Sequence, residues 1–196
     1  FAAYIIIDSM NKEKQAELAL RTQKGDKHAF GLLYEEFVRP IYKFIYFKTH
    51  HKQTAEDILS ATFIKALDNI NSFKAELGPF SAWLYQIARN TIIDQYRSKK
   101  PEMNIDDAWD LSDGSDLMRD IDARDKIKKV EKYLKEFTSE QRDIVIMRVW
   151  QGLSYEEISA VLGKSEASCK MMYSRTMKKL RETMPLLMFL EFIINL

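Results

Sequence analysis

The sequence predicts an all-helical protein made of two small helical domains joined by a flexible, acidic linker. Apolar residues recur every three or four positions in several long segments, as they do in helices that bury one face, and strand signals are scarce. Between about Pro101 and Asp125 this periodicity fades and aspartate becomes frequent, which is typical of flexible chain. The length of 196 residues suffices for two such domains.

Composition along the chain indicates five segments. Phe1 to Ser9 has neither the basic start nor the cleavage pattern of a signal peptide, so we interpret it as an added leader before Met10. The last residues are almost wholly apolar but far fewer than the roughly 20 that cross a bilayer, which favours a docking element over direct membrane insertion. The predicted boundaries are 1–9 for the leader, 10–100 for the first domain, 101–125 for the linker, 126–184 for the second domain and 185–196 for the apolar tail.

Charge is distributed unevenly although the formal net charge is only +1. Basic residues outnumber acidic ones by 15 to 10 in residues 10–100 and by 13 to 9 in residues 126–196, whereas residues 101–125 hold 2 basic and 9 acidic residues. Two basic blocks suit a nucleic-acid partner, but an ordinary solvated surface fits the counts equally well. The single cysteine, Cys169, excludes an internal disulfide and cannot form a zinc site alone, which suits a reducing cytoplasm.

Three amphipathic helices are expected in the first domain. One spans residues 27–48, a second opens near Thr54 as its N-cap, and a third runs from residue 80 to about 97, after the Gly-Pro pair at 78–79. Their predicted buried faces hold Phe30, Leu33, Phe37, Ile41, Phe44 and Ile45 in the first helix, Ile58 or Leu59, Phe63, Leu67 and Ile70 in the second, and Phe80, Trp83, Leu84, Ile87 and Ala88 in the third.

The second domain carries the most informative local pattern. Helices are expected at about 126–137, 139–150, 154–162 and 165–182, and each of the last three opens with a serine. Ser154 and Glu157 have the spacing of a capping box, Gly163 permits the left-handed turn that ends a helix, and Ser165 can cap the next one. Helix, tight glycine turn and helix is the helix-turn-helix pattern, although an ordinary pair of antiparallel helices fits the spacing equally well.

Residues 139–163, SEQRDIVIMRVWQGLSYEEISAVLG, closely resemble the domain of bacterial sigma factors that reads the minus-thirty-five promoter element. The chain is thereby similar to the small extracytoplasmic-function (ECF) RNA polymerase sigma factors. The resemblance implies that the helix after Gly163 contacts this element. The implied contacts are Ser165, Glu166, Ser168, Lys170, Ser174, Arg175 and Lys178.

That helix departs from the family at residues 168–172, SCKMM, where a string like TVKSR is usual. A usual basic contact is missing at Met172, which affects the expected DNA affinity or sequence choice. Cys169 takes the small apolar position of the string, so we expect it to pack rather than to sense redox state. Glu166, near the helix start, could accept a hydrogen bond from a cytosine or only favour the helix dipole.

Residues 55–67, AEDILSATFIKAL, resemble the helix with which sigma factors bind core RNA polymerase. The family implies that this helix docks on the clamp helices of the largest catalytic subunit. Periodicity alone favours a plain amphipathic bundle helix over a docking helix. The implied contacts are Asp57, Ile58, Thr62, Phe63 and Lys65.

Residues 80–97, FSAWLYQIARNTIIDQYR, resemble the helix that opens and reads the minus-ten element, and the loop at 71–78 corresponds to the one that captures an unpaired base. Stacking on an aromatic ring is worth about 1–3 kcal/mol per base, comparable to the cost of unstacking it. Phe80 and Trp83 are expected in the core because they share a stripe with Leu84. The implied contacts are Asn71, Phe73, Lys74, Tyr85, Arg89, Asn90 and Arg97.

The resemblance implies a non-enzymatic subunit that binds core RNA polymerase, at its clamp helices and flap, and directs promoter-specific initiation. Promoter DNA and an anti-sigma factor are the other implied partners, and the implied location is the cytoplasm, where an anti-sigma factor could hold the protein at the membrane. No cofactor or metal is expected, because neither Glu56-Asp57 nor His50-His51 has a known ligand spacing. The alternative is a helix-turn-helix transcriptional regulator whose N-terminal domain senses a ligand or forms dimers.

Overall fold

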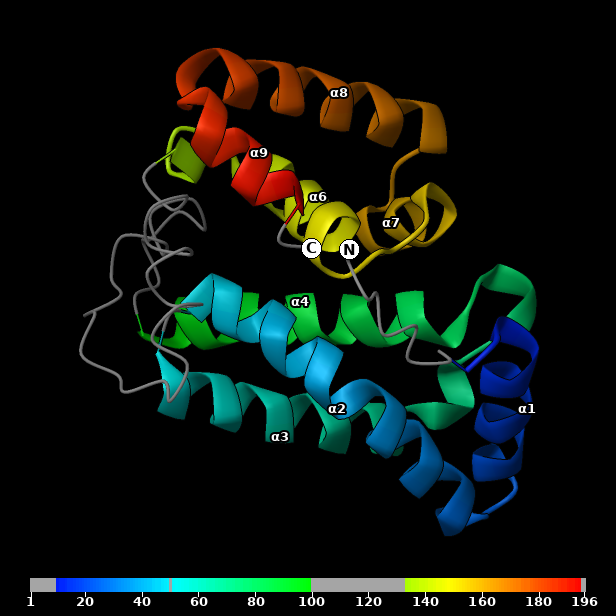
Figure 1. Ribbon diagram of the computed structural model, residues 1–196. Helices are drawn as coiled ribbons and strands as arrows, with labels where there is room; N and C mark the ends of the chain where they lie inside the picture. Colours follow the sequence, from blue (N-terminus) through cyan, green and yellow to red (C-terminus); the bar gives the residue numbers. More distant parts are fainter. Residues whose placement is uncertain (1–9, 50, 100–132, 195–196) are drawn as a thin grey trace.

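The computed structural model describes residues 10–49, 51–99 and 133–194, and Figure 1 shows them as two groups of helices. Every regular element in these ranges is a helix, which confirms the predicted all-helical, two-domain fold. The expected leader at 1–9 and linker at 101–125 lie outside the described residues. We call the group formed by residues 12–99 the first bundle and the group formed by residues 139–194 the second bundle.

The first bundle packs four α-helices and two short 3-10 turns around one core. The elements are α1 (Lys12–Gln23), α2 (Lys27–Thr49), α3 (Lys52–Asp68), η1 (Ile70–Ser72), η2 (Ala75–Leu77) and α4 (Phe80–Lys99). Leu33, Ile41 and Phe44 of α2 are fully buried, as their helical spacing predicts. Phe80 of α4 is also buried, and its ring lies 5.7 Å from that of Phe37.

The start and the exposed side of α3 differ from the prediction. The helix begins at Lys52, and its N-cap is His51, whose Nδ1 accepts a hydrogen bond from the Thr54 amide at 3.2 Å. A histidine ring nitrogen thus supplies the acceptor that Thr54 was expected to supply. Leu67 was expected in the core, but 44% of it is exposed, because Phe63 and Ile70 fill the interior at this level.

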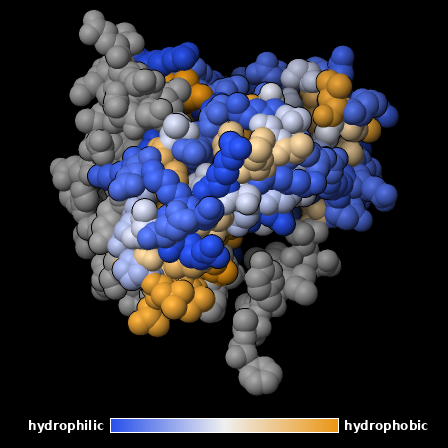
Figure 2. All heavy atoms as spheres, turned by 90° about the horizontal axis from the view of Figure 1, so that it is seen from above, coloured by the Kyte–Doolittle hydropathy of each residue, from blue (hydrophilic) through white to orange (hydrophobic). Residues whose placement is uncertain are grey.

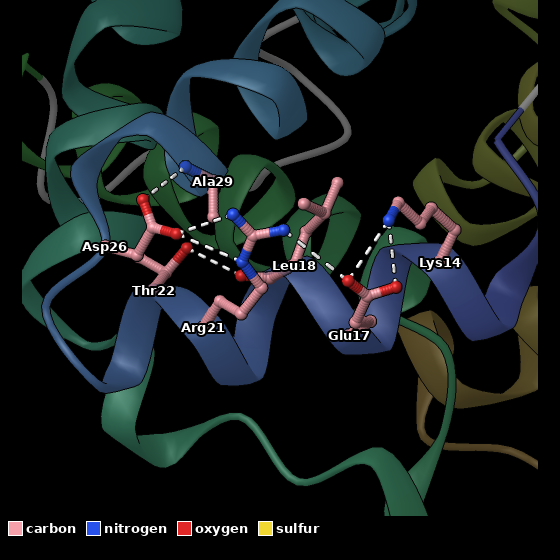
Figure 3. A network of polar contacts seen from close by, with 7 residues as sticks. All are labelled: Lys14, Glu17, Leu18, Arg21, Thr22, Asp26 and Ala29. Carbon is pink, nitrogen blue, oxygen red and sulfur yellow. Dashed lines mark hydrogen bonds and ion pairs between the residues drawn. The ribbon is translucent and has the colours of Figure 1, made fainter.

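The corner between α1 and α2 is fixed by charged side chains (Figure 3). Arg21 donates to the carboxylate of Asp26 through two nitrogens, at 2.7 and 3.0 Å. The other oxygen of Asp26 accepts from the amide of Ala29 at 3.1 Å, as a cap does at a helix start. These bonds, led by the one from Arg21, lower the pKa of Asp26. The chain therefore reverses over three residues without leaving the amide at the start of α2 unpaired.

The second bundle comprises a broken helix, the helix-turn-helix and a C-terminal helix. Its elements are α6 (Ser139–Val145), the π-helical turn η4 (Ile146–Trp150), α7 (Tyr155–Leu162), α8 (Glu166–Thr183) and α9 (Leu186–Ile194). The N-cap of α6 is Thr138 rather than Ser139, because Gln141 lies three residues after the threonine and completes its capping box. The segment expected as one helix over 139–150 thus changes to a π-helix halfway.

The turn between α7 and α8 has the predicted helix-turn-helix geometry. Ser154 accepts from the Glu157 amide at 3.2 Å, and the Glu157 carboxylate accepts from the Ser154 amide at 2.8 Å. Gly163 ends α7 with φ 65° and ψ 34°, a left-handed conformation that residues with a side chain rarely adopt. Ser165 caps α8 by accepting from the Ser168 amide at 3.2 Å. Each local signal in the sequence therefore has its expected structural role.

Helix α9 accounts for most of the apolar tail, which was expected to be a docking element. Phe189 and Phe192 are buried against the rest of the chain. The opposite side of the helix remains exposed, through Leu186, Leu187, Leu190 and Ile193. No helix among the described residues is both long enough and apolar enough to span a membrane.

We predict that Ser154→Ala lowers the free energy of unfolding by about 1 kcal/mol, because the first turn of α7 loses its reciprocal cap. Urea denaturation followed by circular dichroism measures the change. The matched control is Ser60→Ala, whose hydroxyl only donates to the Glu56 carbonyl within α3 and should shift stability by less than about 0.5 kcal/mol. Equal effects of the two substitutions would contradict the capping role.

Candidate functional site

Helix α8 presents a polar, basic face away from the core of its bundle. Ser165, Glu166, Lys170, Ser174, Arg175 and Lys178 are exposed, and Ser168 is half-buried. Figure 2, which looks down on this side of the molecule, shows a mostly hydrophilic surface with a hydrophobic patch at its lower edge. Glu166, Lys170, Ser174 and Lys178 follow one another at intervals of four, so they form a continuous line along the helix. All the residues predicted to contact the minus-thirty-five element therefore lie on the open side of α8 or at its margin.

The other side of α8 is occupied by packing. Cys169, Thr176 and Leu180 are buried, and Met172 is half-buried against the core. Burial raises the pKa of the Cys169 thiol, which disfavours the reactive thiolate. The predicted packing role of Cys169 agrees with this position. Met172, where the family usually has a basic contact, is committed to the same apolar side.

Local charges hold two residues of the open face in place. Lys170 pairs with Glu166 one turn earlier at 3.5 Å, and its ammonium lies 5.6 Å from the centre of the Tyr155 ring. Lys178 approaches Glu182 at 4.0 Å. Such exposed pairs are weak, so a stronger anionic partner such as phosphate can displace them. The cations of α8 are consequently available for binding.

Helix α3 buries three of the five residues predicted to bind polymerase. Ile58, Thr62 and Phe63 face the core, and the Thr62 hydroxyl donates to the Ile58 carbonyl at 2.7 Å. Asp57 is exposed, and Lys65 pairs across the surface with Asp94 of α4 at 2.9 Å. The roles of these residues toward polymerase stay predictions.

Two large apolar side chains on the open side of α3 were not predicted to bind a partner. Ile64 is 61% exposed and Leu67 is 44% exposed. Exposed apolar residues beside charged ones are typical of a surface that binds another protein. The sequence signal was that five of the ten residues in 58–67 have large apolar side chains, more than one buried face of a helix requires.

The residues predicted to read the minus-ten element divide into exposed and buried ones. Asn71, Lys74, Asn90 and Arg97 are exposed. Phe73 is buried, with its ring 5.5 Å from Phe80 and 5.7 Å from Trp83, so in this arrangement it supports the loop from below. Tyr85 is also buried, and burial strongly raises the pKa of its hydroxyl.

Helix α4 lies directly against the second bundle, as Figure 1 shows. Three residues spaced by four along α4 contact the second bundle. Ser81 donates to Glu157 at 2.5 Å, the Tyr85 hydroxyl donates to Gln151 Oε1 at 3.2 Å, and Arg89 Nε donates to Asp143 at 2.9 Å. We call Ser81, Tyr85 and Arg89 the covered stripe of α4.

Asp143 lies at the centre of the contact between the two bundles, which we call the junction. Its side chain is fully buried, and each carboxylate oxygen faces one cation of the first bundle: Lys48 on one side and Arg89 on the other. Lys48 Nζ also lies 3.2 Å from Ser139 Oγ. Sequence reasoning did not single out Asp143, although an acidic residue directly before the apolar run IVIM at 144–147 was a signal. Two predicted promoter contacts, Tyr85 and Arg89, are thus engaged inside the molecule.

Among the described residues, no three acidic, histidine or cysteine side chains come together as a metal site would require. The candidate functional surfaces are the open face of α8, the open side of α3, and α4 with the loop before it.

Comparison with known proteins identifies both bundles. Residues 33–102 match the Sigma-70 region 2 family, and residues 127–180 match the Sigma-70 region 4 family. The ECF RNA polymerase sigma factor BldN of Streptomyces coelicolor is 30% identical over 177 residues, which cover 88% of this chain and 66% of BldN. The ECF RNA polymerase sigma factor SigW of Bacillus subtilis is 30% identical over 174 residues, which cover 83% of this chain and 92% of SigW.

A solved sigma factor structure has the same fold as this chain. The sigma factor RpoE of Bartonella quintana, crystallised with the anti-sigma factor NepR, superposes with a TM-score of 0.59 at 25% identity, over 78% of this chain and 94% of that chain. Regions 2 and 4 of a sigma factor follow one another in the expected order along one polypeptide. The chain therefore belongs to the ECF family of RNA polymerase sigma factors, and it directs promoter-specific initiation of transcription by RNA polymerase.

Proposed function

We propose that the chain performs this function through three surfaces. The open face of α8 reads the minus-thirty-five element, α4 with its preceding loop reads and opens the minus-ten element, and the open side of α3 docks on the clamp helices of core polymerase. The domain limits proposed for these tasks are 10–100 and 126–184. The observation that carries the proposal is the open face of α8, where seven predicted contacts lie together on a capped helix.

The chemistry of α8 suits both parts of DNA recognition. Lys170, Arg175 and Lys178 can bind phosphates, which fix the position of the helix on the duplex. Ser165, Glu166 and Ser168 lie at the N-terminal end, the part of a recognition helix that reaches base edges in the major groove. Because Met172 packs inward, sequence choice would depend on this first turn and on Lys170.

Partners and location follow from the same proposal. The chain adds no catalytic group of its own to the polymerase. The RpoE and NepR complex supports an anti-sigma factor as a partner, and polymerase with promoter DNA would place the chain in the cytoplasm, where an anti-sigma factor anchored in the membrane could retain it. The alternative, a regulator that senses a ligand through its first domain, is disfavoured because that domain matches region 2.

We expect Lys170→Ala and Arg175→Ala each to weaken binding to the minus-thirty-five duplex and to reduce the salt dependence of binding by about one unit of slope. A suitable duplex can be selected from random sequences with the full chain, and fluorescence anisotropy over a range of salt concentrations gives the slope. Lys43→Ala, which removes an exposed cation from α2, is the control and should change neither value. Equal weakening by the control would argue against α8 as the reading helix.

Asn90→Ala and Lys74→Ala should reduce promoter opening about 10-fold while leaving minus-thirty-five binding intact, since each loses a contact of about 1–2 kcal/mol to unpaired DNA. Permanganate footprinting of unpaired thymines with core polymerase measures opening. Gln86→Ala, at another exposed position of α4, is the matched control. Undiminished footprints in both variants would remove α4 and its loop from the proposal.

Ile64→Glu should weaken association with core polymerase at least about 10-fold, because a charge replaces an exposed apolar side chain on the docking side of α3. Titration of core polymerase against labelled sigma factor measures the affinity. Leu20→Glu makes the same change at an exposed position of α1 and should bind normally. If both variants bind as tightly as the unchanged chain, polymerase docks elsewhere.

A further inference from the structure

The C-terminal helix α9 packs beside the junction of the two bundles. Phe192, only 5% exposed, meets the ring of Trp150 edge-on, with the centroids 5.4 Å apart and the planes at 78°. On its face, Trp150 stacks on Phe47 of α2, with centroids 4.3 Å apart and planes only 7° from parallel. One indole ring of the second bundle therefore contacts both α9 of the same bundle and α2 of the first bundle.

The position of Trp150 depends on unusual backbone geometry. It is the last residue of the π-helical turn η4, and Gly152 then turns the chain with φ 66°. A π-helical turn changes the direction in which the following side chains point relative to a regular α-helix, and such turns occur frequently at functional sites. The turn places the indole between Phe47 and Phe192 rather than within the core of the second bundle.

The aromatic contact and the ionic contact of the junction act together. Asp143 engages Lys48 and Arg89, while the ring of Trp150 covers Phe47, one residue before Lys48 on α2. The covered stripe of α4 lies under α6 and α7 as a result. In contrast, the reading residues of α8 are on the far side of the second bundle and stay open.

We propose that α9 is an intramolecular clasp that holds the rest of the second bundle over the minus-ten reading helix, so that the free sigma factor inhibits itself. Phe192 supports the Trp150 ring, that ring fixes the second bundle on α2, and Asp143 occupies the cations Lys48 and Arg89. The consequence for DNA binding rests on the proposed role of α4, whereas the clasp itself does not. Release of α9 frees Arg89 and the hydroxyl of Tyr85 without altering α8.

This closed arrangement cannot occupy a promoter. The minus-ten and minus-thirty-five elements are about 25 base pairs apart, which corresponds to about 85 Å along B-form DNA. Helix α8, with 18 residues, is only about 27 Å long, and α4 contacts the bundle that contains it. The bundles must therefore separate before both elements are read. The chain between Lys99 and Tyr133 can span about 110 Å when fully extended, so its length permits the separation.

The junction has the properties of a contact that can open. Gln151 Nε2 is buried there without a hydrogen-bond acceptor among the described residues, an unfavourable arrangement that opening relieves. The ion pair between Lys12 and Glu156, which also joins the bundles, is half-exposed and thus weak. The contacts of α9 therefore add a small free energy to an equilibrium between the closed and the open arrangement of the bundles. Such an addition can decide how much of the open arrangement is populated.

Small-angle X-ray scattering of the full chain, without polymerase or inhibitor, tests the clasp directly. Phe192→Ala and Asp143→Asn should each increase the radius of gyration from that of a compact chain, about 16 Å for this length, by several ångström. The matched controls are Leu187→Ala on the exposed side of α9 and Asp94→Asn, which breaks an ion pair within the first bundle; both should remain compact. Circular dichroism confirms that helix content is retained. If Phe192→Ala folds poorly, a chain ending at Met184 removes α9 as a whole.

Binding of a mixed-sequence single strand of 20 nucleotides tests the consequence. The two opening variants should bind it at least about 10-fold more tightly than the unchanged chain, because the competent state is more populated. The clasp is overturned if the unchanged chain already scatters as two separate bundles, or if both variants scatter as compactly as the controls. Opening without a gain in DNA binding would instead overturn the proposed role of α4 and leave the clasp established.

Discussion

A buried carboxylate organises the contact between the two halves of this sigma factor. Asp143 has no exposed side-chain surface, and removing a carboxylate from water costs several kcal/mol unless cations compensate it. Lys48 and Arg89 supply that compensation from the first bundle, so the charge is tolerated only while the bundles touch. Separation returns all three groups to water. A pair of this kind adds little net stability to the closed state, but it strongly specifies which surfaces meet.

This specificity determines which of the two proposed promoter-reading surfaces is open. The covered stripe of α4 includes Arg89, which carries the type of charge that binds phosphate, and Asp143 occupies it as a phosphate would. Among the described residues, the cations of α8 meet exposed carboxylates instead: Lys170 and Lys178 approach acidic residues of the same helix at 3.5 and 4.0 Å, and Lys179 approaches Glu136 at 3.6 Å. The two proposed DNA-binding surfaces therefore differ in availability, because one has a buried intramolecular competitor and the other has weak, exposed ones.

Local features of the fold could be predicted from the sequence, whereas the junction could not. The capping box of Ser154, the left-handed Gly163 and the buried stripe of α2 depend on residues a few positions apart, and the sequence contains all the information that fixes them. The contact of Asp143 with Arg89 joins residues 54 positions apart, and no periodicity encodes it. The N-cap His51 and the exposed Leu67 were misjudged for a related reason, since tertiary packing selects one of several locally acceptable solutions.

The inward position of Met172 reflects two demands on α8: one side of the helix must pack on the core, and the other side must stay open for DNA. A recognition helix must bury one side to be held rigidly, and Cys169, Met172 and Leu180 do so here. A basic residue in place of Met172 would have to reach DNA from this apolar side, whereas Lys170 and Arg175 project from the open face. The loss of one usual cation is therefore compatible with DNA binding, because phosphate contacts contribute separately and several remain. In the proposed mode of binding, the first turn then carries a larger share of recognition, and Glu166 there offers an acceptor that suits a cytosine amine better than an oxygen or a methyl group.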